Sequence, residues 1–196
     1  MGMIFKNDIP YAGGVENNIR YNEESDSIQV YSSSLSKWVD VISGCVYYLA
    51  LIPTLSSYSA SNGNCIYSSE LNDTYKAWYA FDGDENTIGA TVIETNNFIG
   101  YQWNNNVKIK GVEARYKFLH GEQKTITFKL QYLNGSEWVD IEGDKSYTFN
   151  TQNMSVELIW SLPDYIETNG IRIYSTASTG THAPGYSSIQ VYGMNN

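Results

Sequence analysis

Apolar and polar residues alternate along most of this chain with a period of two residues. Examples are Phe128-Lys129-Leu130-Gln131-Tyr132 and Gly170-Ile171-Arg172-Ile173-Tyr174. This period is typical of β-strands that have one face in a core and the other in solvent. The 3.6-residue period of an amphipathic helix is not evident, so helix should be scarce. The pattern predicts an all-β fold with strands at 47–52, 63–68, 76–81, 97–103, 107–117, 124–133, 136–141, 154–161, 169–176 and 187–193.

Loops should gather at the two ends of a sandwich built from these strands. Binding residues usually lie on loops that a rigid scaffold positions, so the loops are where we expect binding chemistry. They are predicted at 53–62, 69–75, 82–96, 118–123, 142–153, 162–168 and 177–186.

The first 45 residues differ from the rest of the chain. Residues 1–25 are polar and have few apolar anchors. In the segments 27–31 and 37–41, by contrast, apolar and polar residues alternate, and a serine-rich turn lies between them. This pattern predicts a β-hairpin. An isolated hairpin is marginally stable in water, so this one should pack on the sandwich or on copies of itself. We therefore expect residues 1–46 to be an extension for assembly or docking, and 47–196 to be the sandwich.

A turn with many oxygen ligands follows the predicted strand at 76–81. Asp82-Gly83-Asp84 reverses the chain, and glycine is suited to such a turn. The carboxylates of Asp82 and Asp84, the hydroxyl of Thr87 and the turn carbonyls are ligands of the kind that Ca²⁺ prefers. Two interpretations remain open: a structural Ca²⁺ site, and a polar turn without metal.

An ordered set of motifs resembles the discoidin, or coagulation-factor C-type, family of galactose-binding-like β-sandwiches, which includes many carbohydrate-binding modules. The family has an A-x-D-G-x-x-x-T turn, a mid-domain L-Q hairpin with tryptophan, and a closing strand that ends in Y-G. Over residues 47–194, the matching segments are Ala80–Thr87, Gly100-Tyr101-Gln102-Trp103, Phe128–Tyr132 with Glu137-Trp138-Val139-Asp140-Ile141, Gly170–Tyr174 and Ile189-Gln190-Val191-Tyr192-Gly193.

The resemblance implies a galactose-binding-like, jelly-roll β-sandwich and a glycan ligand. Relatives commonly complete the Ca²⁺ site with a glutamate from the closing strand, where this chain has Ser188, so the site should be weakened. In sugar-binding relatives a histidine, an arginine, an asparagine and an aromatic residue converge on the ligand. Arg115 and Arg172 lie in predicted strands, which leaves the usual arginine without a clear equivalent.

Sugars are bound by aromatic rings that cover their apolar faces and by planar polar groups that bond their hydroxyls. Such residues in or next to the predicted loops are the candidate ligand-binding residues. They are Tyr58, Asn62, Tyr75, Trp78, His182 and Tyr186.

Composition narrows the class of protein. The 17 tyrosines and five tryptophans among 196 residues favour strands and half-exposed aromatic surfaces. A formal net charge of −9 argues against nucleic-acid partners. No apolar run approaches the roughly 20 residues of a membrane span, so membrane insertion is not expected.

Neither signal peptide nor catalytic constellation is evident. The N-terminus lacks a basic region followed by an apolar core, so we expect release without a signal peptide, for example by lysis, or prior removal of a leader. Cys45 and Cys65 either pair or remain two reduced, buried thiols. Neither His120 nor His182 lies beside a nucleophile motif, and the acidic residues occur in turns or in the leader, so we do not expect an enzyme.

Residues 1–45 look similar, more loosely, to leader segments of bacteriophage tail-fibre and baseplate proteins. Three hypotheses follow: a glycan-binding receptor module of a phage or phage-tail-like particle, a structural virion component that uses the sandwich for protein contacts, and a carbohydrate-binding module of a secreted enzyme. The first predicts a cell-surface glycan as ligand, self-association or particle partners through residues 1–45, and a location in a virion or extracellular particle.

Overall fold

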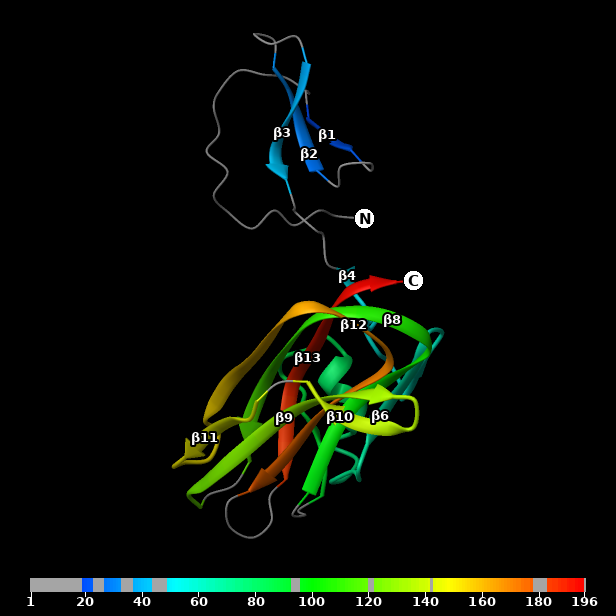
Figure 1. Cartoon of the computed structure of the whole chain (residues 1–196). Coiled ribbons are helices and arrows are strands. Elements are labelled where there is room, and N and C mark those ends of the chain that lie inside the picture. Colours follow the sequence, from blue (N-terminus) through cyan, green and yellow to red (C-terminus); the bar gives the residue numbers. More distant parts are fainter. Residues whose placement is uncertain are drawn as a thin grey trace. The chain divides into compact units, whose positions relative to one another are not determined.

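The computed structural model of the protein describes residues 19–22, 27–32, 37–43, 49–92, 96–119, 122–141, 143–177 and 183–195 (Figure 1). Internal contacts divide the chain into two compact units, Met1–Tyr47 and Tyr48–Asn196. No helix in the described ranges is long and apolar enough to cross a membrane.

The first unit contains a three-stranded antiparallel sheet. Its strands are β1 (Ile19–Asn22), β2 (Ser27–Ser32) and β3 (Lys37–Ser43), in the order β1-β2-β3. The hairpin predicted at 27–31 and 37–41 is confirmed as the β2–β3 pair. The strand β1, which the sequence did not predict, pairs with β2 and leaves β1 and β3 at the sheet edges.

The second unit is nearly all strand, as the alternating pattern predicted. Its elements are β4 (Leu49–Ala50), β5 (Ser59–Ala60), β6 (Gly63–Tyr67), the 3₁₀ helix η1 (Ala77–Phe81), β7 (Gly89–Ala90), β8 (Asn96–Phe118), β9 (Lys124–Asn134), β10 (Glu137–Asp140), β11 (Lys145–Phe149), β12 (Ser155–Ala177) and β13 (Pro184–Asn195).

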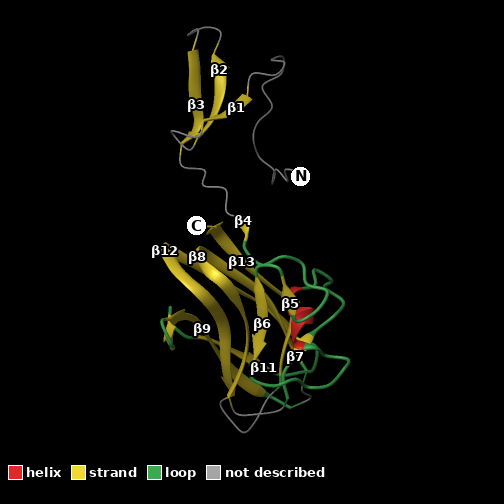
Figure 2. Ribbon diagram, turned by 90° about the vertical axis from the view of Figure 1, so that its right-hand side faces the viewer, coloured by secondary structure: helices red, strands yellow, loops and turns green. Residues whose placement is uncertain are grey.

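Two long strands bend and carry the chain from one layer of the sandwich to the other (Figures 1 and 2). The N-terminal part of β8 pairs with β6 and with the C-terminal part of β12, which also pairs with β9. The C-terminal part of β8 pairs with β13 and with the N-terminal part of β12. Strands β10 and β11 extend the first layer through β9, and β4 and β7 border β13 in the second.

The continuity of these strands differs from the prediction in two places. The segments predicted separately at 97–103 and 107–117 join in β8, and those at 154–161 and 169–176 join in β12, so the loop expected at 162–168 is strand. A further strand, β11, lies inside the loop predicted at 142–153. In β12 the pairing with β8 is interrupted by register shifts between Ser161 and Ile166 and between Thr168 and Gly170, and it resumes beyond each.

The strand predicted at 76–81 is instead the helix η1. Ala77, Ala80 and Phe81 are buried, a spacing that suits a short helix resting on the core. Tyr79 and Phe81 flank Ala80, and over so few residues this pattern fits either a strand or a helical turn. The sequence prediction at this segment was therefore wrong.

Aromatic rings fill the space between the two layers. Tyr116 on β8 packs edge-to-face against Phe128 on β9, with ring centroids 4.8 Å apart. It also contacts Phe149 and Tyr186, at 5.1 and 5.5 Å. All four side chains are almost completely buried. This cluster fixes the spacing of the layers.

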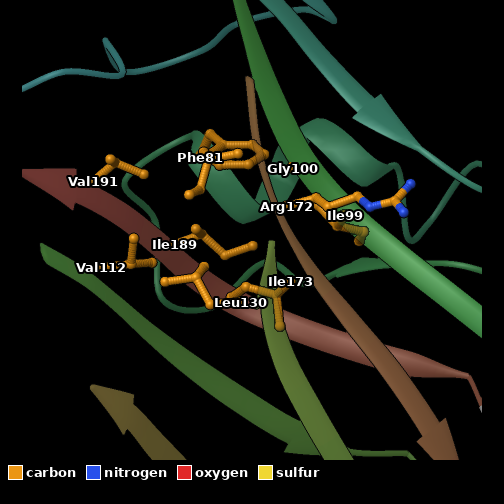
Figure 3. Close-up of a pocket in the computed structure, with 10 residues that line it drawn as sticks. Phe81, Ile99, Gly100, Val112, Leu130, Arg172, Ile173, Ile189 and Val191 are labelled. Carbon is orange, nitrogen blue, oxygen red and sulfur yellow. The ribbon is translucent and has the colours of Figure 1, made fainter. Parts of the chain in front are cut away.

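The interior leaves no room for a ligand at the cavity drawn in Figure 3. That cavity has a volume of about 10 Å³ and is lined mainly by apolar residues such as Phe81, Leu130 and Val191. About one water molecule would already fill it. The Arg172 side chain at its border points away from these residues, toward the outer face of the first layer (Figure 3).

Candidate functional site

The short strands β5 and β6 lie near the helix η1 at the border of the first layer (Figure 2), and polar and aromatic side chains from these segments and the loop between them meet there. The rings of Tyr58, before β5, and Tyr67, at the end of β6, lie 5.6 Å apart at a 35° tilt, and both are half-buried. The Tyr58 hydroxyl donates a hydrogen bond to Glu70 Oε1. The same oxygen accepts a bond from the backbone N–H of Ala77, at 2.9 Å. We call Tyr58, Tyr67, Glu70 and Lys76 the edge cluster.

The local sequence explains why these residues meet. Strands β5 and β6 form a tight hairpin, and the backbone N–H of Cys65 donates to the carbonyl of Tyr58 at 2.7 Å, which sets the two tyrosines side by side. Loop 68–76 then returns to η1, and the Glu70 carboxylate joins the loop to the first N–H of that helix. The carboxylate thereby satisfies a donor that a helix start leaves unpaired.

The charges of the edge cluster are coupled. Burial raises the pKa of Tyr58 well above its ordinary value, and the hydrogen bond and negative charge of Glu70 add to the rise. Burial and the Glu70 charge likewise raise the pKa of Tyr67. Lys76 pairs with the exposed Asp73 at 3.1 Å, and this partner raises its pKa. At neutral pH the two tyrosines and Lys76 therefore keep their protons.

This combination has the chemistry of a shallow sugar site. Half-exposed rings can cover the apolar face of a pyranose, and the carboxylate and ammonium groups can bond its hydroxyls. Of the residues predicted from sequence, Tyr58 belongs to the cluster. Tyr75 and Trp78 flank Lys76 in the chain and are half-buried. Trp78 packs partly on the core, with its ring 4.5 Å from that of Tyr79.

The Asn62 side chain makes hydrogen bonds within the fold. Its amide nitrogen donates to the carbonyl of Leu51 at 3.1 Å, and its amide oxygen accepts from the Tyr101 hydroxyl at 2.6 Å. The carbonyl of Asn62 also accepts from the N–H of Asn104. The amide is committed to these internal bonds, so we do not retain Asn62 as a ligand-binding residue.

Two candidate ligand-binding residues, His182 and Tyr186, come from the loop predicted at 177–186. Tyr186 lies within β13 and is fully buried among the core aromatics, so its proposed role in surface binding is wrong. The strand β13 begins three residues before the predicted one, and a register shift after Tyr186 interrupts the alternation that leads to Ile189 and Val191. His182 lies outside the described residues, and its role stays a prediction.

The Asp82-Gly83-Asp84 turn gathers oxygen atoms as predicted. Gly83 has φ +76°, the left-handed region that favours glycine. Thr87 Oγ1 lies 2.7 Å from Asp82 Oδ2 and 2.9 Å from the carbonyl oxygen of Asp84. Asp84 Oδ1 accepts bonds from the N–H and the amide of Asn86, which lower the pKa of this carboxyl group.

Ser188 lies near this turn, at the position where the resemblance placed the missing glutamate. Ser188 and Gly83 both line a surface pocket of about 100 Å³. Across the described parts of the chain, no three or more Asp, Glu, His or Cys side chains form a group able to hold a metal. The turn therefore fits Ca²⁺ only through two carboxylates, a hydroxyl and carbonyls, which is a donor set of low charge.

Solved structures of similar architecture identify the fold. One is a mutant of chitosan-binding module 1 from a chitosanase/glucanase of Paenibacillus sp. IK-5, with a TM-score of 0.53 and 18% identity over 75% of this chain and 100% of that chain. Another is the family 32 carbohydrate-binding module of C. perfringens NanJ in complex with galactose, with a TM-score of 0.50 and 16% identity over 73% and 98% of the chains. The fold is the galactose-binding-like, or discoidin-type, β-sandwich.

A similar fold also occurs as part of a longer chain. A Ruminococcus gnavus GH29 fucosidase in complex with fucose matches 71% of this chain, with a TM-score of 0.52 and 18% identity, but the match covers only 26% of the fucosidase. No protein-family model matches the sequence, and neither does any curated protein sequence. The similarity therefore establishes the fold alone, and the ligand has to be argued from the residues of this chain.

The sequence pattern did not indicate Tyr67, Glu70 and Lys76, the other residues of the edge cluster. Tyr67 lies at the end of β6 and is half-buried, Glu70 lies in a loop, and Lys76 lies at the start of the segment predicted as a strand. The helix η1 begins after Lys76, which cannot accept a capping hydrogen bond as Ser, Thr, Asp or Asn would. This missing cap is a local sign that the first N–H of the helix needs an acceptor from elsewhere, such as the Glu70 carboxylate.

Cys65 lies beneath the edge cluster of the discoidin-type domain and is 6% exposed. Burial, reinforced by the negative charge of Glu70, raises the pKa of its thiol to about 12. Because the thiolate is the reactive form, we expect Cys65 to resist iodoacetamide at pH 8 in the folded protein and to react readily in urea. Mass spectrometry of the labelled peptide measures this, and rapid labelling of the native protein would contradict the burial described here. Cys45 lies outside the described residues, so its pairing stays open.

Proposed function

We propose that this chain is a non-catalytic, glycan-binding module of a phage or phage-tail-like particle that recognises the surface of a host cell. One observation carries the binding part of the proposal. Tyr58 and Tyr67 place two half-buried rings 5.6 Å apart beside the Glu70 carboxylate, on a discoidin-type sandwich. Structures with this fold include a chitosan-binding module and a module in complex with galactose.

Binding at the edge cluster should be weak for each copy. A shallow surface buries little of a monosaccharide, and only the surplus over the cost of association appears as affinity. Several copies held together would multiply weak binding, and we assign that task to residues 1–46. The first unit has a sheet of its own, β1-β2-β3, and is the part of the chain to which we assign this assembly.

Two other functions compete with this one. The sandwich of a structural virion component would meet protein neighbours and would need no sugar. A module of a secreted enzyme would resemble the part of the fucosidase, 26% of its chain, that matches this protein. The genes next to this one distinguish a particle operon from a hydrolase, and a glycan array distinguishes binding from a structural role.

The test of glycan binding is an array of bacterial polysaccharides and host-type glycans, probed with the full chain. Tyr58→Ala should lower binding by about tenfold or more, because interface aromatic rings often contribute more than ~1 kcal/mol. Glu70→Gln should also weaken binding.

The matched controls are Tyr147→Ala, which removes an exposed tyrosine from β11, and Glu113→Gln on β8. Both should bind as the wild type does. Binding that is unchanged in Tyr58→Ala and Glu70→Gln would refute the edge cluster as the site, and absence of any binding would favour the structural role.

We also propose a structural Ca²⁺ at the turn formed by Asp82, Asp84 and Thr87. The low charge of its ligands suggests a dissociation constant of about 10⁻⁴ to 10⁻³ M, as in extracellular modules. A ligand that binds only the folded state stabilises it, by about 2.7 kcal/mol when its concentration is 100 times Kd. Calcium at 10 mM should therefore raise Tm relative to excess EDTA, and Asp82→Ala should abolish the increment. Equal Tm values with Ca²⁺ and with EDTA would refute the proposed Ca²⁺ site.

A further inference from the structure

The outer face of the first layer carries a continuous row of hydrogen-bonding groups. In β9, Ile126, Phe128 and Leu130 are buried, and the alternate residues face outward. The same alternation in β12 directs Arg172 outward, between the buried Ile171 and Ile173. The register sets Arg172 opposite Gln131 on β9 and Gly100 on β8. We call Arg172 and the outward residues of β9 and its neighbours, Gln131, Asp140, Lys129, Thr127, Ser146, Thr125 and Thr148, the β9 track.

Arg172 is held rigidly at one end of the β9 track. Its guanidinium lies 4.2 Å from the ring centroid of Trp138 on β10 and 4.6 Å from that of Phe98 on β8, so aromatic rings approach it from both sides of β12. Arg172 Nε donates to Gln131 Oε1 at 2.7 Å. These contacts fix the plane of the guanidinium, which limits the entropy that it would lose on binding a ligand.

The terminal nitrogens of Arg172 have no acceptor within the described part of the chain. No carboxylate there forms an ion pair with it either, although Arg115 on the other layer pairs with both Glu85 and Glu157. Half-burial of a guanidinium costs hydration, and this cost lowers its pKa. The terminal N–H groups of Arg172 therefore form a planar set of donors that is fixed, partly dehydrated and unpaired. Such donors can readily bond an acceptor from a ligand.

The track continues from Arg172 along β9 as alternating donors and acceptors. Gln131 Nε2 donates to Asp140 Oδ1 at 2.8 Å, and Lys129 Nζ donates to Asp140 Oδ2 at 2.9 Å. Two hydroxyl pairs follow, Thr127 with Ser146 at 2.9 Å and Thr125 with Thr148 at 2.8 Å. From residue 125 to 131, at about 3.3 Å for each residue, the row is roughly 20 Å long.

We propose that the β9 track is a second glycan-binding surface, separate from the edge cluster, that takes an extended and uncharged polysaccharide chain. Each sugar hydroxyl is both a donor and an acceptor, so a row of mixed partners on rigid strands suits successive sugars. The described exposed large apolar residues, which are Leu49, Tyr147, Met154 and Ile159, are not among the track residues. A protein partner would instead favour an apolar centre.

Charge argues for a neutral ligand. Lys129 is already neutralised by Asp140 and by Asp144, which lies 3.5 Å away. A polyanion would meet these carboxylates and a chain whose net charge is −9. This inference rests on the glycan-binding function proposed above and adds an extended chain to the ligands of that function.

The test is affinity gel electrophoresis of the full chain in barley β-glucan, xylan and galactan, with alginate as a charged polysaccharide. The neutral polymers should retard the wild type, and affinity should increase from monosaccharide to hexasaccharide. Arg172→Lys keeps the charge but loses the planar fork, so it should weaken binding by about tenfold or more. The control Arg115→Lys changes the corresponding residue type on the other layer and should leave binding unchanged.

A second variant protects the test against loss of folding. The double change Thr127→Val with Ser146→Ala removes a hydroxyl pair without touching the Arg172 stack, and it should weaken binding severalfold. Normal retardation of both track variants would overturn the proposal, as would a preference for alginate or no retardation of the wild type in any neutral polymer.

The two sites can fail independently. If Tyr58→Ala abolishes binding and the track variants do not, glycan binding stands and the β9 track is refuted. If the track variants lose polysaccharide binding while Tyr58→Ala and Glu70→Gln bind normally, the β9 track stands and the edge cluster is refuted.

Discussion

Replacing Tyr116 with alanine is expected to lower the free energy of unfolding by about 3–5 kcal/mol, which is the usual cost of removing a large ring from a core. The ring touches Phe128 across the sandwich and also Phe149 and Tyr186, so its loss leaves a cavity that neither layer can close alone. For a domain of this size, Tm should fall by roughly 6–20 °C. Thermal unfolding followed by circular dichroism measures the change.

The matched variant Tyr116→Phe separates the ring from its hydroxyl. In the described structure the Tyr116 hydroxyl is buried without a hydrogen-bond partner, so removing it should leave stability unchanged or higher. A loss above about 1 kcal/mol in Tyr116→Phe would show that the hydroxyl has a partner after all. A loss below about 1 kcal/mol in Tyr116→Ala would contradict the central place of this ring in the core.

The same pair of proteins should differ in alkali. Burial raises the pKa of Tyr116 above its ordinary value of 10.0. Above about pH 10 the unfolded chain therefore loses this proton while the folded chain keeps it, so the free energy of unfolding falls as pH rises. Tyr116→Phe lacks this contribution and should lose less stability than the wild type between about pH 10 and pH 11.5. Parallel urea titrations across that range make the comparison.

Local periodicity explains why most of the fold could be predicted from the sequence. Buried Ile126, Phe128 and Leu130 alternate with polar residues, and this signal requires no knowledge of partners. The signal fails where two structures fit the same few residues, as at η1. It also fails at 104–106, where three polar residues suggest a loop but the strand β8 continues through an exposed bend.

The candidate sites depend on contacts between distant residues, which no local pattern can reveal. Tyr58 and Glu70 meet because loop 68–76 folds back to η1. Arg172 was correctly placed in a strand, but its contacts with Trp138 and Phe98 require the strand order β10-β9-β12-β8. The aromatic residues were reasonable candidates by type, and only the tertiary structure distinguishes the buried Tyr186 from the half-exposed Tyr58.

Register within the first unit gives a physical reason for self-association. Val30 on β2 pairs with Ile19 on β1 and with Val39 on β3, and Ile28 on β2 pairs in the same way with Tyr21 and Ile42. Residues paired across neighbouring strands share a face of the sheet, so mainly apolar positions gather on one face. Trp38, by contrast, pairs with Tyr31, one position along β2 from Val30. We propose that another copy of the chain is the partner of these apolar positions.

Deletion of residues 1–46 is therefore expected to lower attachment to a glycan-coated surface by about 10²–10⁴, because linked copies convert later binding events into intramolecular ones. The affinity of one domain for a soluble oligosaccharide should not change, since both candidate sites lie in the second unit. Sedimentation at micromolar concentration should show an oligomer for the full chain and a folded monomer for the deletion. Fusing the deleted chain to an unrelated trimeric coiled coil should restore attachment if multivalency is the cause. A full chain that sediments as a monomer yet attaches as strongly as before would show that one sandwich suffices, and residues 1–46 would then need a different role.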